Sequence, residues 1–222
     1  MPAASKTTAA PADLFNNPAL SESVRDLARR GVVSDYRKGA VLIEEGDRGD
    51  VIYIILAGQL RAYGSGAGDR EITYGAYGPG EYLGEMGLDG EPRSASVMAL
   101  THSVCSAVTR PTLEAFIAER PAFAFELIAK VIRRARAATL SAKQLALNDV
   151  YGRLKYLLES GATARPDGRL HFAESLTHRD LASRLGCSRE MVSRLLGDLE
   201  RGGYLTQQDH GLLVERRLPP RW

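Results

Sequence analysis

The residues from 79 to 96 combine glycines, one arginine and several side-chain oxygens in an order that suits an anion. A short helical turn that starts near Gly84 would aim free N–H groups at such a ligand. Arg93 can pair through two N–H groups with phosphate oxygens, and the Ser94 hydroxyl adds a further donor. Glu85 suits a ribose hydroxyl as an acceptor. The pattern favours a nucleotide site, although Gly-Glu and Arg-Ser are also common in ordinary turns.

A second group of polar side chains, Arg189, Glu190 and Arg194, lies in the first turns of a predicted helix. Arginine can donate two hydrogen bonds to guanine, and glutamate can accept one from the amino group of cytosine. Recognition helices place such residues against base edges in the major groove. An exposed set of ion pairs along one helix is the alternative, and the local context decides between the two.

That context predicts a winged helix-turn-helix. Thr177 with Asp180 three residues later resembles a capping box, and Gly186 can end a helix in the left-handed conformation. Ser188 then caps the second helix, and residues 204–206 and 212–214 read as a small β-wing. The apolar residues of the second helix recur on one inner face: Val192, Leu195, Leu196 and Leu199. With cap, turn and wing in place, we expect DNA reading.

The elements before position 120 have a different character. From Gly31 to about Val108, short apolar runs such as residues 51–56 and 96–100 alternate with glycine- or aspartate-rich turns. Many short strands of this kind predict a sandwich or barrel. An amphipathic helix over about 18–30 is expected to pack in front of it.

A single long helix is predicted over 121–148. Pro121 can open it, and no Gly or Pro follows until Gly152, which gives roughly 40 Å at 1.5 Å per residue. One apolar stripe follows helical spacing: Leu127, Val131, Ala135, Ala138, Ala142 and Leu145. A parallel coiled coil between two copies is the favoured interpretation, and packing within one chain is the alternative.

The composition sets limits on partners and compartment. The net charge is +2, with 12 basic and 10 acidic residues in 149–222, so DNA affinity must come from locally placed arginines. Two cysteines, Cys105 and Cys187, give no disulfide framework and no four-cysteine metal site. No run approaches a membrane span or a signal sequence, so we expect a cytoplasmic protein.

Residues 31 to about 217 resemble the CRP/FNR family, the cyclic-AMP receptor protein family of bacterial transcription regulators. The resemblance rests on three groups of motifs in the right order. They are Lys38-Gly39, Glu45-Gly46-Asp47, Tyr53-Ile54-Ile55 and Gly58-Gln59-Leu60 in the first part, then Gly84-Glu85-Met86 with Arg93-Ser94-Ala95, then residues 186–194. It implies an α+β protein with an N-terminal jelly-roll-like β-roll, a long dimerisation helix and a C-terminal winged helix-turn-helix.

The expected organisation therefore has four parts. A disordered tail covers 1–17, a cyclic-nucleotide-binding β-roll 18–120, the dimerisation helix 121–148, and the DNA-binding domain 149–222.

The resemblance also implies roles for single residues. The cyclic phosphate would sit on Gly84, Met86, Arg93 and Ser94, with Glu85 on the ribose. In the long helix, Arg134 matches a ligand-side arginine, and Thr139 matches a serine that reaches the nucleobase from the partner subunit. Arg189, Glu190 and Arg194 would read a half-site similar to TGTGA. The residues expected near DNA phosphates are Thr177, His178, Arg179 and Ser188.

Two departures bear on the effector. Ala138 stands where cyclic-AMP-responsive members commonly have a threonine, and the loop from Glu85 to Arg93 is slightly shorter than usual. Cyclic AMP is the first choice, with cyclic GMP, cyclic di-GMP or no ligand as alternatives. The ligand is expected to act by extending or re-registering the long helix near Asn148-Asp149, which places the recognition helices about 34 Å apart on a palindromic operator.

Other classes of function fit less well. No catalytic or metal-binding residues stand out, and the four histidines are scattered, which argues against a cupin-type metalloenzyme. Two separated cysteines argue against an iron–sulfur sensor, and a haem sensor stays open. The helix-turn-helix argues against a nucleotide-binding module without DNA. RNA polymerase is a possible partner, through exposed loops such as residues 160–169.

Overall fold

The fold consists of two compact units. The computed structural model describes residues 12–66, 70–174, 176–208 and 211–222. The first unit combines the described residues up to Gly64 with Thr73–Arg134, and the second combines Ser65–Ile72 with Ala135–Trp222. The division between Arg134 and Ala135 falls inside one continuous helix.

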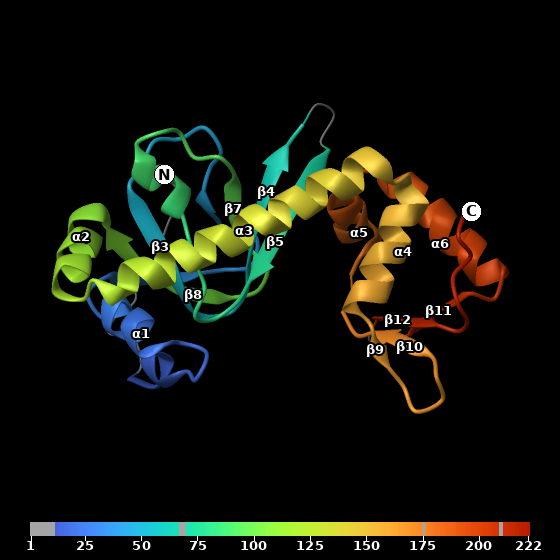
Figure 1. Cartoon of the computed structure of the whole chain (residues 1–222), viewed down its shortest axis with the longest axis horizontal. Helices are drawn as coiled ribbons and strands as arrows, with labels where there is room; N and C mark the ends of the chain where they lie inside the picture. The colour runs from blue at the N-terminus through green and yellow to red at the C-terminus, as the bar shows by residue number, and fades with distance from the viewer. Residues whose placement is uncertain (1–11, 67–69, 175, 209–210) are drawn as a thin grey trace. The chain divides into compact units, whose positions relative to one another are not determined.

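The strands of the predicted β-roll lie mainly in the first unit (Figure 1). They are β1 (Val32–Tyr36), β2 (Val41–Ile43), β3 (Val51–Ala57), β4 (Leu60–Ser65), β5 (Glu71–Tyr77), β6 (Tyr82–Leu83), β7 (Ser96–Ala99) and β8 (Ser103–Thr109). They form two four-stranded sheets, in the orders β1-β8-β3-β6 and β2-β7-β4-β5. The α+β class with an N-terminal β-roll is confirmed.

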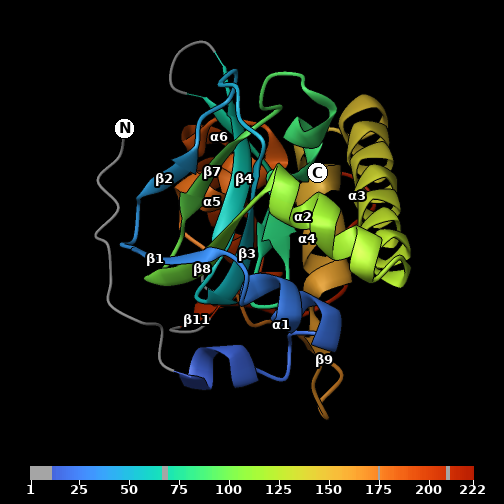
Figure 2. The same ribbon diagram turned by 90° about the vertical axis from the view of Figure 1, so that its left-hand side faces the viewer.

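Two short helices cover the roll. Both α1 (Glu22–Ala28) and α2 (Arg110–Glu119) pack against β8 (Figure 2). The N-terminus of α1 is capped by Ser21, so this helix is shorter than the predicted 18–30. The sequence analysis missed α2, which has Pro111 in its first turn, where a proline has no hydrogen bond to lose.

Part of the expected tail is ordered. Residues 1–11 of the tail predicted over 1–17 lie outside the described residues. Ala12–Asn16 forms a short 3-10 helix, η1, because Leu14 and Phe15 pack against the core of the first unit. The prediction of disorder is wrong for this segment.

The long helix α3 (Ala122–Leu147) begins directly after Pro121, as predicted. Its first turns pack inward through Phe123, which meets Phe116 edge-on at 5.2 Å between ring centroids, and through Leu127. Leu127, the first residue of the predicted stripe, is therefore partly covered by the roll. In the described part of the chain, no helix is long and apolar enough to cross a membrane.

The second unit is the predicted winged helix-turn-helix. Its elements are α4 (Val150–Gly161), β9 (Thr163–Ala164), β10 (Leu170–Phe172), α5 (His178–Leu185), α6 (Arg189–Arg201), β11 (Leu205–Gln208) and β12 (Gly211–Val214). The strands form one sheet in the order β11-β12-β10-β9, of which β9 and β10 were not predicted. Asp209 and His210, expected in the turn of the wing, lie outside the described residues.

The predicted end signals of these helices are confirmed. Thr177 and Asp180 form a complete capping box, Gly186 ends α5 with φ +63°, and the Ser188 side chain accepts from the N–H of Met191. The inner face of α6 is buried at all four predicted positions: Val192, Leu195, Leu196 and Leu199.

The C-terminal tail closes this unit against α4. The Tyr151 hydroxyl donates to the Pro219 carbonyl at 2.7 Å, and Lys155 Nζ reaches the carbonyls of Leu218 and Pro219. Trp222 packs edge-on against Tyr204, with 5.4 Å between ring centroids. The first turns of α4 are thereby tied to the C-terminal segment that follows the wing.

The turn between β3 and β4 gives a matched test of crowding. Gly58 and Gly39 share a φ of +85°, but a Cβ at Gly58 would lie 2.3 Å from Ser103 Oγ, whereas no described atom lies within 4 Å of one at Gly39. Gly39→Ala should lower the free energy of unfolding by about 1–2 kcal/mol, the cost of the left-handed conformation. Gly58→Ala should lower the free energy of unfolding by about 1–3 kcal/mol more than Gly39→Ala, because the added Cβ overpacks the turn. Urea unfolding of both variants measures the difference, and equal losses would contradict the crowding.

Candidate functional site

The predicted anion-binding turn is present. Gly84 has φ +96° and is followed by a 3-10 helix, η2 (Glu85–Asp89), whose first turn has no side-chain cap. A helical turn does start near Gly84, as predicted, and its first N–H groups have no partner from a capping side chain. We call the segment from Gly84 to Ser94 the cassette.

Arg93 lies inside the cassette. It is 8% exposed, and its guanidinium donates to the carbonyls of Gly84 (2.6 Å) and Val51 (2.8 Å). A Cβ at Gly87 would lie 2.6 Å from Arg93 Nη1, so glycine is required there. A buried guanidinium needs acceptors, and these carbonyls supply them. Since the group has five N–H donors, a phosphate contact by the others is compatible with these two bonds.

Glu85 and Arg134 form a buried ion pair beside this turn. Glu85 Oε1 lies 2.5 Å from Arg134 Nη1, with side chains 7% and 19% exposed. Burial opposes the charge of Arg134, but the neighbouring carboxylate of Glu85 outweighs it and raises the pKa of the guanidinium. The structure thus brings together the predicted sugar-reading carboxylate and the predicted ligand-side arginine.

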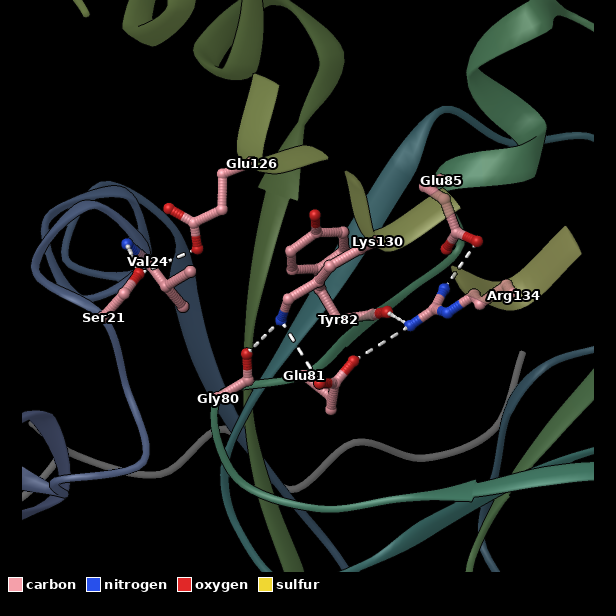
Figure 3. Close-up of polar contacts among 9 residues, drawn as sticks. All are labelled: Ser21, Val24, Gly80, Glu81, Tyr82, Glu85, Glu126, Lys130 and Arg134. Carbon is pink, nitrogen blue, oxygen red and sulfur yellow. Dashed lines mark hydrogen bonds and ion pairs between the residues drawn. The ribbon is translucent and has the colours of Figure 1, made fainter. Parts of the chain in front are cut away.

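Further residues around this pair escaped the sequence analysis (Figure 3). Arg134 Nη2 donates to the Tyr82 carbonyl at 2.5 Å, and its guanidinium lies 4.7 Å from the centroid of the Tyr77 ring. Lys130, one turn earlier on α3, is buried, and Glu81 lies between the two cations. The spacing of four between Lys130 and Arg134 was the available signal, because it puts both on one face of a helix.

The other predicted ligand residues lie in two places. Ser94 is exposed in the cassette, and its hydroxyl contacts Met86 Sδ at 3.3 Å. Thr139 belongs to the second unit, where it is exposed and its hydroxyl donates to the Ala135 carbonyl of its own helix at 3.0 Å. The structure therefore groups six of the seven predicted ligand residues in the first unit, and Thr139 belongs to the second unit.

The predicted DNA-reading side chains lie on the helix-turn-helix. Arg189, Glu190 and Arg194 are exposed on α6, where Arg194 Nη2 contacts Met191 Sδ at 3.1 Å. The pKa of Glu190 is lowered, first by its own backbone N–H and then by the Ser188 hydroxyl. Glu190 therefore stays ionised, as an acceptor of a hydrogen bond from cytosine must.

The residues predicted near phosphates surround the start of α5 and α6. Thr177 and Ser188 cap the two helices, and Arg179 has a side chain that is 75% exposed. His178 Nδ1 lies 2.8 Å from Ser193 Oγ, which joins the first turn of α5 to the middle of α6. This contact was not predicted.

Metal and thiol chemistry find little support in the described residues. No group of three or more histidine, cysteine or acidic side chains comes together there as a metal site would require. Cys105 is buried, and burial raises the pKa of its thiol to about 12, while Cys187 is half-buried.

Comparisons with known proteins identify both halves. Residues 33–120 match the cyclic nucleotide-binding domain, and residues 154–217 match the Crp-like helix-turn-helix domain. The chain is 34% identical over 175 residues to the cyclic AMP receptor protein of Thermus thermophilus, covering 77% of each. The chain belongs to the CRP/FNR family of transcription regulators. It is a cyclic-nucleotide-binding, DNA-binding regulator of this family.

Other members are similar over most of their length. A CRP-like cAMP-activated global transcriptional regulator of Mycobacterium tuberculosis is 29% identical over 184 residues, covering 81% of this chain and 82% of that one. The c-di-GMP responsive regulator CLP of Xanthomonas campestris has the same fold, with a TM-score of 0.76, 22% identity, and coverage of 88% and 99%. These CRP/FNR proteins are transcription regulators, so the alternative of a cupin-type enzyme is set aside.

Arg93→Lys tests the structural part of the arginine's role. A lysine can reach one of the two carbonyls, so the other is left unpaired, and the free energy of unfolding should fall by about 1–3 kcal/mol. Arg48→Lys, in the exposed loop between β2 and β3, should change it by less than about 0.5 kcal/mol. Urea unfolding measures both, and equal stability of the two variants would contradict the bridging role of Arg93.

Proposed function

We propose that this regulator is a cytoplasmic homodimer that binds cyclic AMP in the cassette and then binds a palindromic, TGTGA-like operator. The observation that carries the proposal is the buried pair between Glu85 and Arg134 beside the turn at Gly84. It supports the proposal because Glu85, the turn at Gly84 and the long helix meet at this pair.

The cassette offers each part of a cyclic nucleotide a partner. The N–H groups after Gly84, the Ser94 hydroxyl and the remaining donors of Arg93 suit the cyclic phosphate. Glu85 accepts from the ribose hydroxyl, and this requires it to share or leave Arg134. The ligand therefore acts on α3 directly, because it competes with Arg134 for Glu85.

Cyclic AMP is preferred over other nucleotides because of the relatives. The cyclic AMP receptor protein of Thermus thermophilus is 34% identical to this chain, whereas the cyclic di-GMP regulator CLP is 22% identical. The nucleobase would be read by Thr139 from the partner helix, since the Thr139 side chain is exposed on α3. Cyclic GMP and cyclic di-GMP are outcomes of the test below.

DNA binding follows from the exposed end of α6. Arg189 and Arg194 can each donate to a guanine, and Glu190 can accept from a cytosine. Phosphate contacts would come from the residues at the starts of α5 and α6: Thr177, His178, Arg179 and Ser188. Contacts with RNA polymerase, if the regulator activates, would involve the exposed turn between β9 and β10.

The outer face of α3 supports the homodimer. Seven large apolar side chains of α3 are 42% to 76% exposed: Phe125, Ile128, Val131, Ile132, Leu140, Leu145 and Leu147. At 100° per residue, Val131, Ala138 and Leu145 of the predicted stripe share this outer face and are exposed, whereas the face of Ile132 also carries charged side chains. Such an apolar stripe suits a second copy of the same helix.

Coupling between the sites needs a difference in affinity. A ligand shifts a dimer from mostly inactive to mostly active only if it binds the active form about 5.5 kcal/mol more tightly in total. The ion pair between Arg134 and Glu85 would differ between the ligand-free and ligand-bound forms. The difference in affinity would therefore act through α3.

The first test titrates protein against a labelled TGTGA palindrome and follows fluorescence anisotropy. Cyclic AMP should raise the DNA affinity at least tenfold, and Ser94→Ala should weaken the response because it removes a phosphate donor without touching a buried contact. Cyclic GMP and cyclic di-GMP are run in parallel. A response only to one of these would replace cyclic AMP as the effector, and tight binding without any nucleotide would refute ligand control.

The second test concerns the dimer. Light scattering after size exclusion should give about twice the 24.1 kDa mass of one chain. Val131→Glu places a charge on the apolar face and should yield monomers, whereas Arg133→Glu, two positions on and outside this face, should leave the dimer intact. A monomeric wild-type protein, or an intact dimer for Val131→Glu, would contradict the assignment of this face.

A further inference from the structure

The long helix holds the segment before the cassette at two points. Lys130 Nζ donates to the Gly80 carbonyl at 2.6 Å, and Arg134 Nη2 donates to the Tyr82 carbonyl at 2.5 Å (Figure 3). The two cations lie one helical turn apart, and the two carbonyls lie two residues apart. Together they fix the register of α3 against β6.

Lys130 is unusually well enclosed for a lysine. Its side chain is 10% exposed, its Nζ lies 3.5 Å from Glu81 Oε1, and it sits 4.4 Å from the centroid of the Tyr82 ring. Glu81 Oε2 lies 3.5 Å from Arg134, so one carboxylate bridges both cations. A lysine buried to this degree needs such partners to keep its charge.

The two cations differ in what a ligand does to them. Arg134 pairs with Glu85, the residue expected to turn to the ribose. The contacts of Lys130 are with Gly80, Glu81 and Tyr82, all outside the cassette. A nucleotide therefore loosens one contact of α3 and leaves the other in place, and Glu81 offers Arg134 a second carboxylate when Glu85 leaves.

We propose that Lys130 is a positioning residue, which anchors α3 to Gly80 and Glu81 so that a nucleotide at Glu85 moves Arg134 against a fixed point. The inference rests on the proposed function. Without the anchor, the ligand still binds the cassette. It no longer changes the DNA affinity, because α3 is then already loosely held against β6.

The anchor requires a charged amine. Burial lowers the pKa of Lys130, while Glu81 and Glu126 oppose this and Arg134 adds to it; Tyr82 is the remaining titratable group in contact. As the pH rises through that lowered pKa, the amine loses its charge and the anchor weakens. An arginine at this position keeps its charge across the same range.

The experiment compares wild type with Lys130→Met, Lys130→Arg and the exposed control Lys143→Met from the same helix. The readout is the ratio of DNA affinities with and without saturating cyclic AMP, beside the affinity for cyclic AMP itself. Lys130→Met should lower the ratio at least tenfold and the cyclic AMP affinity less than threefold. Lys130→Arg should have the wild-type ratio of DNA affinities at neutral pH. At alkaline pH the ratio should fall for wild type and stay unchanged for Lys130→Arg. An unchanged ratio, or equal losses of both affinities without rescue by arginine, would overturn the anchor.

Hydrogen exchange tests the anchor without any ligand. Amides of residues 79–85 should exchange at least tenfold faster in Lys130→Met than in wild type, and Lys143→Met should match wild type. Unchanged exchange would overturn the proposal even if the DNA response were altered. If wild-type protein answers to no nucleotide, the proposed function fails, and the exchange rates still decide whether Lys130 anchors the helix.

Discussion

The pair between Glu85 and Arg134 is the contact on which the first unit depends. Two charges taken out of water are tolerated only when they face each other and further hydrogen bonds complete their shells. Here the Tyr82 carbonyl and the Tyr77 ring complete the shell of Arg134. The left-handed turn at Gly84 brings Glu85 to the helix. The same contact therefore fixes both the conformation of the cassette and the position of α3 against it.

The long helix satisfies two different surroundings at once. Its inner face carries Phe123, Lys130 and Arg134 into the roll, and the apolar stripe from Val131 to Leu145 is exposed. The same helix continues into the second unit, whose caps and buried α6 face hold the exposed arginines in place. With a net charge of only +2, these few arginines, and not a general field, must provide the attraction to DNA.

The sequence predicted the parts of the fold that depend on local signals. The capping box at Thr177, the left-handed Gly186 and the spacing of apolar residues on α6 are each set within a few residues. It did not predict α2, the strands β9 and β10, the contact of Leu127 with the roll, or the backbone partners of Arg93. Those depend on packing between distant segments: Val51 and Gly84, for example, lie 42 and 9 residues from Arg93. Lys130 and Tyr82 were missed for the same reason.

The two faces of α3 also make its length a fixed quantity. Each residue advances a helix by about 1.5 Å and turns it by about 100°. One residue removed after Arg134 would turn Ala138, Ala142 and Leu145 away from the line of Val131, although the apolar composition of the helix would be unchanged. A substitution along this helix therefore changes the apolar face at one position only. A single-residue insertion or deletion rotates one half of the face relative to the other by about 100°. Only changes of about three, four or seven residues bring the outer face back near its line, so length here is selected in whole turns.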